Sequence, residues 1–389
     1  MPGQGSEVSH RYNNEKVMDH SSQSTSTPHG VPEVSIIVPA RDEESNLAAC
    51  LQSLVTQAGV AFEIIVVDDG SVDRTREIAQ SFAGVRVISP GSAPHGWTGK
   101  NNAVIAGVQQ ARGEWLLFTD ADTVHRPGSL ARALDEAKRE RADLLSYSPE
   151  QIVETFAERA VMPVVFAELA AHFPPLQVRD QKSGIAAANG QYILVRRSAY
   201  ASVGGHAAVA SGILEDVALA RRFRNAGYRI HFRYGGDVVR TRMYRSWSQL
   251  REGWTKNLAL LFPKPEFLAL ENLVMWLVAW ISLAIAVWGA ATVHFLWTVF
   301  AALWLLVYRR IRVAHFSILN NLIAIAFGPP IFAYLLLRSK RAFSQGQVSW
   351  KGRAYAVRSP FKVSRKKRGE SNSNSKESGN PSRELEAES

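Results

Sequence analysis

Short β-branched runs alternate with helical segments between residues 34 and 147, and this alternation constrains the fold more than any other feature of the sequence. The runs that read as strands are Val34–Pro39, Glu63–Asp69, Val85–Ser89, Trp115–Thr119 and Asp143–Tyr147. Strands of this length that alternate with helices are typical of βαβ units. The sequence therefore predicts an α/β domain with a Rossmann-like, mostly parallel sheet and helices on both faces.

The composition excludes several other kinds of protein. The 389 residues are 46% hydrophobic and 10% aromatic, enough to bury a core, which rules out a disordered or fibrous chain. Cys50 is the single cysteine, so an intramolecular disulfide and a cysteine-based zinc or iron–sulfur site are both excluded. A reducing compartment follows as the expectation.

The net charge of +10 has a local origin. The stretch from Arg338 to Arg368 contains eleven lysines and arginines and no acidic residue. The remainder of the chain is therefore close to neutral, and the basic stretch adjoins apolar segments, where it would meet anionic lipid. We do not expect a nucleic-acid partner.

Two long apolar stretches occupy the last third of the chain. Phe267–Tyr308 has only Glu271 and His294 as ionisable residues before its end, and it is long enough for a helical hairpin of two membrane spans broken near Gly289–His294. The second stretch, 318–337, contains Gly328-Pro329-Pro330 and could be a third span or a re-entrant segment. Its tryptophan-rich and arginine-rich surroundings favour a membrane over a soluble core.

These segments predict four parts. Residues 1–33 form a polar, disordered leader without a signal peptide, and 34–262 form the α/β domain. Residues 263–337 form the membrane helices, and 338–389 form a tail that is basic and then disordered.

Acidic residues follow the strands at the edge of the sheet where a ligand binds in such folds. Asp68 and Asp69 end the second strand, and Asp120 and Asp122 follow the fourth. Lys100 begins a helix nearby in the sequence. Residues two apart on an extended chain point the same way, so Asp120 and Asp122 could face one divalent cation. Each group alone could equally be a turn or a helix cap.

Two nucleotide-binding motifs are absent from the sequence. Pro94 stands where a phosphate-binding loop that ends at Gly99-Lys100 would need a glycine, and Asn101 replaces the Ser or Thr. No Gly-x-Gly-x-x-Gly follows the first strand, which disfavours a nicotinamide or flavin fold. Further along, Glu215 and Asp216 begin a helix, where its dipole favours carboxylates.

Taken in order, five segments resemble the family 2 glycosyltransferases of the GT-A fold over about residues 34–262: VSIIVPARDEE, VVDDGSVDRT, GWTGK, TDAD and EDVALARRFRNAGY. The resemblance implies an inverting, hexosyltransferase-like enzyme that uses a nucleotide-diphosphate sugar, with a UDP-sugar as the expected donor. A looser likeness in GWTKN, NGQYILVRR and the segment 348–353 is to the subgroup that glycosylates carotenoid or hopanoid-type lipids.

The resemblance also implies roles for single residues that bind the donor. Asp69 corresponds to the aspartate that contacts the nucleotide base, with Asp68 beside it. Asp120 corresponds to the first carboxylate of the DxD motif, near the ribose, and Lys100 to a lysine near the nucleotide.

The remaining implied roles concern the metal and the chemistry. Asp122 corresponds to the ligand of Mg²⁺ or Mn²⁺, and Asp216 to the catalytic base. The motif Gln-x-x-Arg-Trp of processive members is altered here, because Gly253 precedes Trp254 and Leu250 takes the glutamine position. Arg251 or Lys256 could supply the phosphate-binding charge instead.

The predicted function is therefore sugar transfer to a hydroxyl or carboxyl group of a membrane lipid. The alternatives are a processive polysaccharide synthase and a membrane-anchored nucleotide-binding protein without turnover. We expect an integral protein of the plasma membrane with its catalytic domain in the cytoplasm, where the basic segments near Arg309 and after Arg338 should also lie. The apolar segment 152–171 could lie on the membrane surface or pack in the core.

Overall fold

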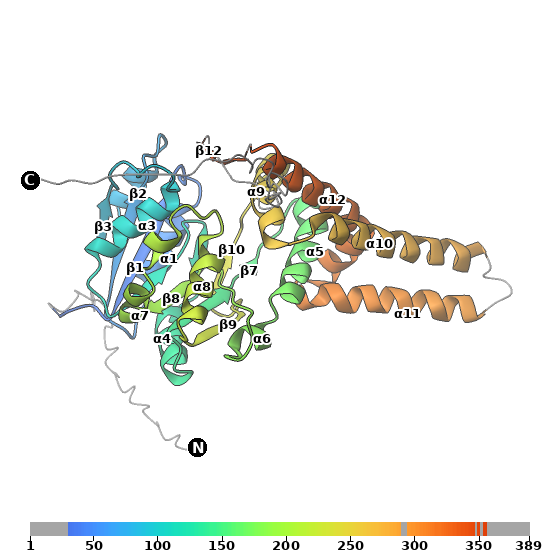
Figure 1. Ribbon diagram of the computed structural model, residues 1–389, viewed down its shortest axis with the longest axis horizontal. Helices are drawn as coiled ribbons and strands as arrows, with labels where there is room; N and C mark the ends of the chain where they lie inside the picture. The colour runs from blue at the N-terminus through green and yellow to red at the C-terminus, as the bar shows by residue number, and fades with distance from the viewer. Residues whose placement is uncertain (1–29, 289–293, 347, 351–352, 356–389) are drawn as a thin grey trace, which may run out of the picture.

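The computed structural model describes residues 30–288, 294–346, 348–350 and 353–355 (Figure 1). Most of the predicted leader, the predicted break at 289–294 apart from its last residue, and most of the basic tail lie outside the described residues.

A seven-stranded sheet in the order β3-β2-β1-β4-β8-β6-β9 forms the centre of the α/β domain. β8 pairs antiparallel with both of its neighbours, and the other pairs in this sheet are parallel. The strands are β1 (Val34–Ala40), β2 (Phe62–Asp68), β3 (Val85–Ile88), β4 (Trp115–Phe118), β6 (Leu144–Ser148), β8 (Ile193–Arg196) and β9 (Ile230–Tyr234). The predicted α/β class with a mostly parallel sheet is confirmed.

Two buried cores hold helices on the two faces of this sheet. Successive strand residues point to opposite faces, so Ile36 and Ile37 of β1 belong to different cores. The core around Ile36 contains side chains of α1 (Leu47–Val55) and α4 (Ser129–Arg139). The core around Ile37 contains side chains of α3 (Gly99–Gln110) and α8 (Glu215–Asn225).

Smaller elements surround this framework. A second sheet has the order β5-β10-β7, and β11 pairs with β12. These strands and the short helices are β5 (Thr123–His125), β7 (Glu150–Gln151), β10 (Val239–Thr241), β11 (Val348–Trp350), β12 (Arg353–Tyr355), α2 (Thr75–Gln80), α6 (Pro175–Arg179), α7 (Arg197–Ser202), η1 (His206–Val209) and η2 (Arg312–Ala314).

Five longer helices lie beyond the sheet. Figure 1 shows α10 (Pro265–Trp288) and α11 (His294–Ile311) side by side, extending away from the α/β domain. A third core joins α5 (Phe156–His172), α9 (Trp247–Leu261) and α12 (Ile318–Ser344) through residues such as Val161, Trp254 and Phe332. The segment 152–171 is therefore largely packed core, although Phe156 is exposed.

α12 runs without a break through Gly328, Pro329 and Pro330, where the sequence suggested a broken path. An internal proline removes a helix hydrogen bond and costs about 3 kcal/mol. Burial of α12 residues on both sides of the prolines, including Ile325 and Phe332, offsets that cost. Among the described residues, α10 and α12 are long and apolar enough to span a bilayer.

Gly107 lets α3 approach the sheet closely, because an added Cβ would lie 2.6 Å from a methyl carbon of Ile37. We predict that Gly107→Val lowers the free energy of unfolding by about 1–3 kcal/mol, since overpacking forces neighbours apart. Thermal unfolding of the purified protein in detergent measures this effect. Gln109→Val, at an exposed position of the same helix, should leave the melting temperature nearly unchanged; equal effects of the two variants would contradict the close contact.

Candidate functional site

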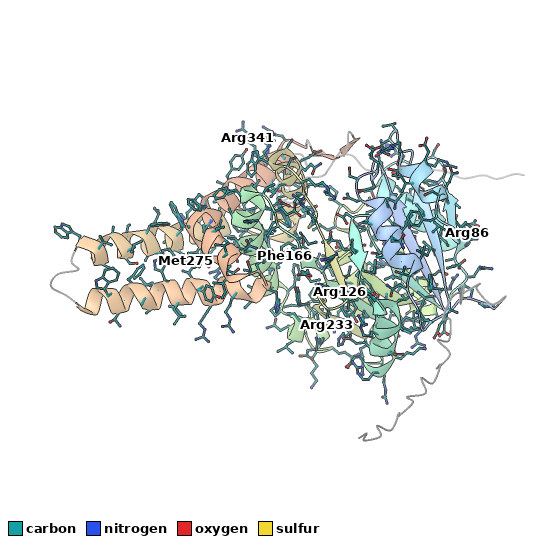
Figure 2. The ribbon with its side chains drawn as sticks, turned by 180° about the vertical axis from the view of Figure 1, so that it is seen from behind. Arg86, Arg126, Phe166, Arg233, Met275 and Arg341 are labelled. Carbon is teal, nitrogen blue, oxygen red and sulfur yellow. The ribbon has the colours of Figure 1, made fainter. Side chains whose placement is uncertain are left out.

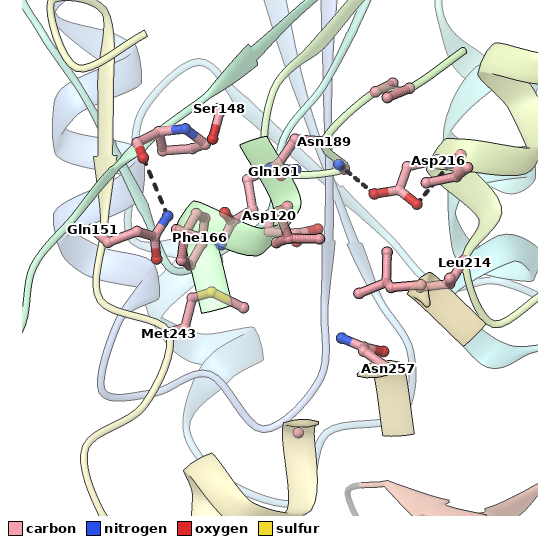
Figure 3. Close-up of a pocket in the computed structure, with 18 of the residues that line it drawn as sticks. Asp120, Ser148, Gln151, Phe166, Asn189, Gln191, Leu214, Asp216, Met243 and Asn257 are labelled. Carbon is pink, nitrogen blue, oxygen red and sulfur yellow. Dashed lines mark hydrogen bonds between the residues drawn. The ribbon is translucent and has the colours of Figure 1, made fainter. Parts of the chain in front are cut away.

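A cavity of about 1040 Å³ opens beyond the carboxyl ends of β1, β2 and β4 (Figure 3). Five of the six predicted site residues line it, namely Asp69, Lys100, Asp120, Asp122 and Asp216. Residues from four separate segments of the chain thus line one cavity. The strand-end argument predicted this convergence for Asp69, Asp120 and Asp122, whereas Asp216 was expected from the family resemblance.

Asp68 is the predicted site residue that does not line this cavity. Its side chain is buried, where it accepts a hydrogen bond from the backbone N–H of Ser71 at 3.2 Å and pairs with Arg76 at 3.5 Å. These contacts hold the turn after β2. Asp69 follows, and its carbonyl oxygen accepts a hydrogen bond from Arg41 at 3.0 Å.

Lys100 connects two acidic residues of the cavity. Its Nζ lies 2.9 Å from Oδ1 of Asp120 and 2.8 Å from Oε1 of Glu215. Burial acts to lower the pKa of Lys100, but the two carboxylates outweigh it and raise this pKa well above its usual value. The lysine is therefore charged, and it partly neutralises an otherwise acidic edge.

Hydrogen bonds at the start of α3 fix the loop that leads into α8. Thr98 caps α3 by accepting a hydrogen bond from the backbone N–H of Asn101 at 3.2 Å. The side-chain amide of Asn101 in turn donates to the carbonyl oxygens of Val209, Ala210 and Gly212. This bonding places Lys100 and the Glu215-Asp216 pair together although they are far apart in the sequence.

Asp216 sits in the first turn of α8 with its carboxylate at the cavity (Figure 3). The backbone N–H of Gly190 donates to its Oδ2 at 2.9 Å, and the backbone N–H of Val217 donates to its Oδ1 at 2.7 Å. Burial and the neighbouring charge of Glu215 raise the pKa of Asp216 to about 6. A carboxylate with such a pKa can accept a proton near neutral pH.

Gly190 allows this arrangement because it has no side chain. A Cβ at this position would lie 3.2 Å from Nζ of Lys100 and 3.5 Å from Oδ2 of Asp216. The lysine and the candidate base therefore both lie close to the backbone of Gly190.

Asp120 and Asp122 suit a Mg²⁺ or Mn²⁺ ion whose remaining coordination positions are filled by a bound ligand. The described residues hold no group of three or more His, Cys, Asp or Glu side chains placed to bind a metal ion. Mg²⁺ is commonly bound by one or two carboxylates together with substrate phosphates and water. Because Lys100 already pairs with Asp120, Asp122 is the better candidate for the direct ligand.

The helix before the hairpin adds Lys256 to the cavity lining, whereas Arg251 is not part of it. Burial lowers the pKa of Lys256, although Glu215 acts in the opposite direction. Gly253 replaces the arginine of the processive motif for a steric reason: a Cβ there would overlap the ring of Tyr244. Of the two cations suggested by the sequence, the structure brings Lys256 to the site.

Apolar side chains line another part of the cavity. Phe166 and Leu169 of α5 lie there with Met243, and the segment 312–315, which follows α11, adds Val313 and Ala314. Arg310, Arg312 and His315 also line the cavity, so this apolar part includes basic groups. The ring of His315 stacks on Tyr234 with centroids 4.0 Å apart. A bound molecule could therefore place a polar group at the acidic edge and an apolar chain toward the helical hairpin.

Several lining residues were not identified as site residues from the sequence. Glu215 was noted only as part of an acidic pair, and Gly190 only as part of the segment NGQYILVRR, without a role of its own. Gln151 and Asn257 each carry a buried side-chain oxygen without a hydrogen-bond donor among the described residues. These two oxygens could accept hydrogen bonds from hydroxyl groups of a ligand.

Comparisons with known proteins show similarity to glycosyltransferases. Residues 35–204 match the model of glycosyl transferase family 2. A 4,4'-diaponeurosporenoate glycosyltransferase of Staphylococcus aureus strain MRSA252 is 29% identical over 341 residues, which cover 83% of this chain and 88% of that protein. The protein of the same name from strain USA300 is 28% identical with the same coverage.

Solved structures give a more distant likeness. The mannosyltransferase PcManGT from Pyrobaculum calidifontis, in complex with GDP-Man and Mn²⁺, is 15% identical with a TM-score of 0.46, covering 81% of this chain and 87% of that one.

We predict that Mn²⁺ binds roughly tenfold or more tightly when a nucleoside diphosphate is present, because the carboxylates need phosphate oxygens to complete the coordination. Electron paramagnetic resonance of free Mn²⁺, with and without UDP, measures the difference. Asp122→Asn should remove the gain, whereas Asp135→Asn, at an exposed position of α4, should keep it. Equal Mn²⁺ affinity with and without the nucleotide would contradict a shared site.

Proposed function

The chain carries a family 2 glycosyltransferase domain of the GT-A fold, and on that premise we propose that it transfers a sugar, with inversion, from a nucleotide-diphosphate sugar to a membrane lipid. The accepting group is a hydroxyl or a carboxyl. The observation that carries the proposal is one cavity that joins the acidic edge at Asp120 and Asp216 to an apolar end beside the helical hairpin.

The donor occupies the acidic edge in this proposal. Asp69, Asp120 and Lys100 contact the nucleotide, and Lys256 adds a second positive charge close to the diphosphate. A divalent ion held by Asp122 and the diphosphate would neutralise the charge that grows on the leaving group. Gln151 and Asn257 accept hydrogen bonds from hydroxyl groups of the sugar or the acceptor.

Asp216 acts as the base when the acceptor is a hydroxyl. Its carboxylate takes the hydroxyl proton while the acceptor oxygen bonds to the anomeric carbon. The bond from that carbon to the diphosphate breaks on the opposite face, and the diphosphate leaves with the bonding electrons. A single displacement of this kind inverts the anomeric centre. A carboxyl acceptor is already ionised near neutral pH and would need less help.

The apolar end of the cavity supports a lipid acceptor, as do the names of the staphylococcal relatives, which specify diaponeurosporenoate. The two candidate membrane helices support an integral membrane protein. We propose that it resides in the plasma membrane with its catalytic domain in the cytoplasm, where nucleotide sugars are made.

The experiment that tests the function supplies labelled nucleotide sugars to membranes that contain the protein. We expect label from one donor, with UDP-sugars the first candidates, to enter the lipid extract. Membranes with Asp122→Asn protein serve as the control and should show little transfer. Label found only in water-soluble products would refute the lipid acceptor.

With a hydroxyl acceptor, we predict that Asp216→Asn lowers turnover by roughly 10²–10⁴-fold while nucleotide-sugar binding is retained, because a positioned general base contributes about this much. Steady-state transfer rates and binding of the donor measure the two effects. Transfer at close to the wild-type rate would leave Asp216 as a helix cap only.

The same role for Asp216 sets a pH dependence. Its pKa is raised to about 6, so the ionised base is lost as the pH falls through that value, and kcat/KM should fall with it. Glu215→Gln removes one of the causes of the raised pKa and should move this acidic limb to lower pH. An acidic limb that stays in place in Glu215→Gln would contradict the electrostatic coupling.

A further inference from the structure

The burial of α12 differs from that of α10, although either helix could span a bilayer by length and composition. In the most apolar window of each helix, 17% of α10 is buried but 50% of α12. α10 and α11 extend away from the α/β domain, whereas α12 runs along it (Figure 1). The partners of α12 along its length therefore decide how it lies in a membrane.

The N-terminal half of α12 lies along α5. The ring of Phe316, just before α12, is 6.2 Å from that of Phe166, and the ring of Phe327 is 5.3 Å from that of Phe156. Gly328 packs so closely that an added Cβ would overlap the carbonyl oxygen of Ala160. These contacts run antiparallel along the two helices.

The C-terminal half of α12 lies along α9. Oγ of Ser339 accepts a hydrogen bond from the backbone N–H of Ala259 at 2.9 Å and donates to the carbonyl oxygen of Thr255 at 2.7 Å. The ring of Tyr334 stacks on Trp247 at 6.3 Å. α12 thus contacts helices of the α/β domain through both of its halves.

The contacts extend from Phe316 to Ser339, a helical distance of roughly 35 Å. The hydrocarbon core of a bilayer is about 30 Å thick. If α12 crossed it, α5 and α9 would be drawn across with it. Charged residues of these two helices, such as the Glu158 that pairs with Arg242, would then have to enter the hydrocarbon. The packing therefore opposes a crossing.

The side of α12 that faces away from the domain is nevertheless apolar. The exposed side chains between residues 318 and 337 form what we call the outer face: Ile318, Leu319, Leu322, Phe327, Tyr334 and Leu337. The exposed side chains that follow, Arg338, Arg341 and Ser344, are polar. Figure 2 places Arg341 at the outer edge of the molecule. Phe156 and Trp247, both exposed, extend the apolar surface onto α5 and α9.

We propose that α12 lies in the plane of a bilayer surface, with its outer face at the boundary between headgroups and acyl chains, and does not cross the membrane. The inference rests on the membrane association in the proposed function. α12 also contacts the hairpin, because the indole N–H of Trp276 in α10 donates to the carbonyl oxygen of Ala326, next to Phe327 of the outer face, at 2.9 Å. Arg338 and Arg341 then meet the phosphates of the headgroups.

This placement has a consequence for the acceptor. α5 and α9 line the cavity with Phe166 and Trp254, and α12 packs on the same two helices from outside. The cavity wall is therefore fixed at one helix diameter from the bilayer surface, which brings the apolar end of the cavity close to lipid.

Accessibility of single cysteines in membrane vesicles tests the topology. In a Cys50→Ala background, cysteines replace Ser81 of the α/β domain, Trp288 at the end of α10, and Ser344 at the end of α12, all exposed. A membrane-impermeant maleimide should label positions 81 and 344 from one side and position 288 from the other. Labelling of 344 together with 288 would overturn the proposal.

The depth of the outer face gives a second readout. A fluorophore at position 319, 327 or 337 of the full-length protein in vesicles should be quenched to a similar extent by lipids brominated near the headgroup, and position 81 should not be quenched. If the fluorophore at position 327 lay deeper in the bilayer than those at 319 and 337, α12 would cross the membrane. If no position were quenched, the outer face would be covered by protein or water. Either result would overturn the proposal. Neither readout depends on sugar transfer. The transfer assay therefore shows separately whether the proposed function fails.

Discussion

The ion pairs of Lys100 with Asp120 and Glu215 are the interaction on which the rest of the site depends. They join the start of α3, the end of β4 and the start of α8, which are distant in the sequence. Without the lysine, several carboxylates would share one partly buried edge, and their repulsion would oppose folding. Glu215, one partner of Lys100, directly precedes Asp216. The same ion pairs therefore also set the electrostatic environment of the proposed base.

The helices α5 and α9 have two contact surfaces each. Their inner sides line the apolar end of the cavity, and their other sides pack against α12. A rigid contact of this kind requires close approach, which Gly328 of α12 permits against α5 because it has no side chain. The shape of the cavity and the position that we propose for the protein on a bilayer therefore depend on the same packed layer. In the function that we propose, the domain supplies the chemistry and this layer brings the cavity close to lipid.

Much of the fold and the site could be predicted because parallel strands end at a common edge. Strand residues that are buried on both faces read as continuous apolar runs, and the acidic residues just after them had to converge. The distinction between Asp68 and Asp69 was harder. Asp68 is the last residue of β2 to pair with β1, and the next residue points the other way, so only Asp69 reaches the cavity. Pattern alone does not say which side of a strand end a ligand will occupy.

The sequence by itself determined the α/β class, the acidic edge with Lys100, and the two apolar stretches, because these follow from local periodicity and from residue chemistry. Tertiary structure alone decided which of Arg251 and Lys256 reaches the site, since residues five apart on a helix point in different directions. It also decided that Glu215 pairs with Lys100 and that α12 continues through two prolines. An apolar helix of this length has the same sequence signature whether it crosses a bilayer or lies along a domain. Only the contacts with α5 and α9 distinguish the two, because they depend on residues eighty or more positions away, as in the hydrogen bonds of Ser339.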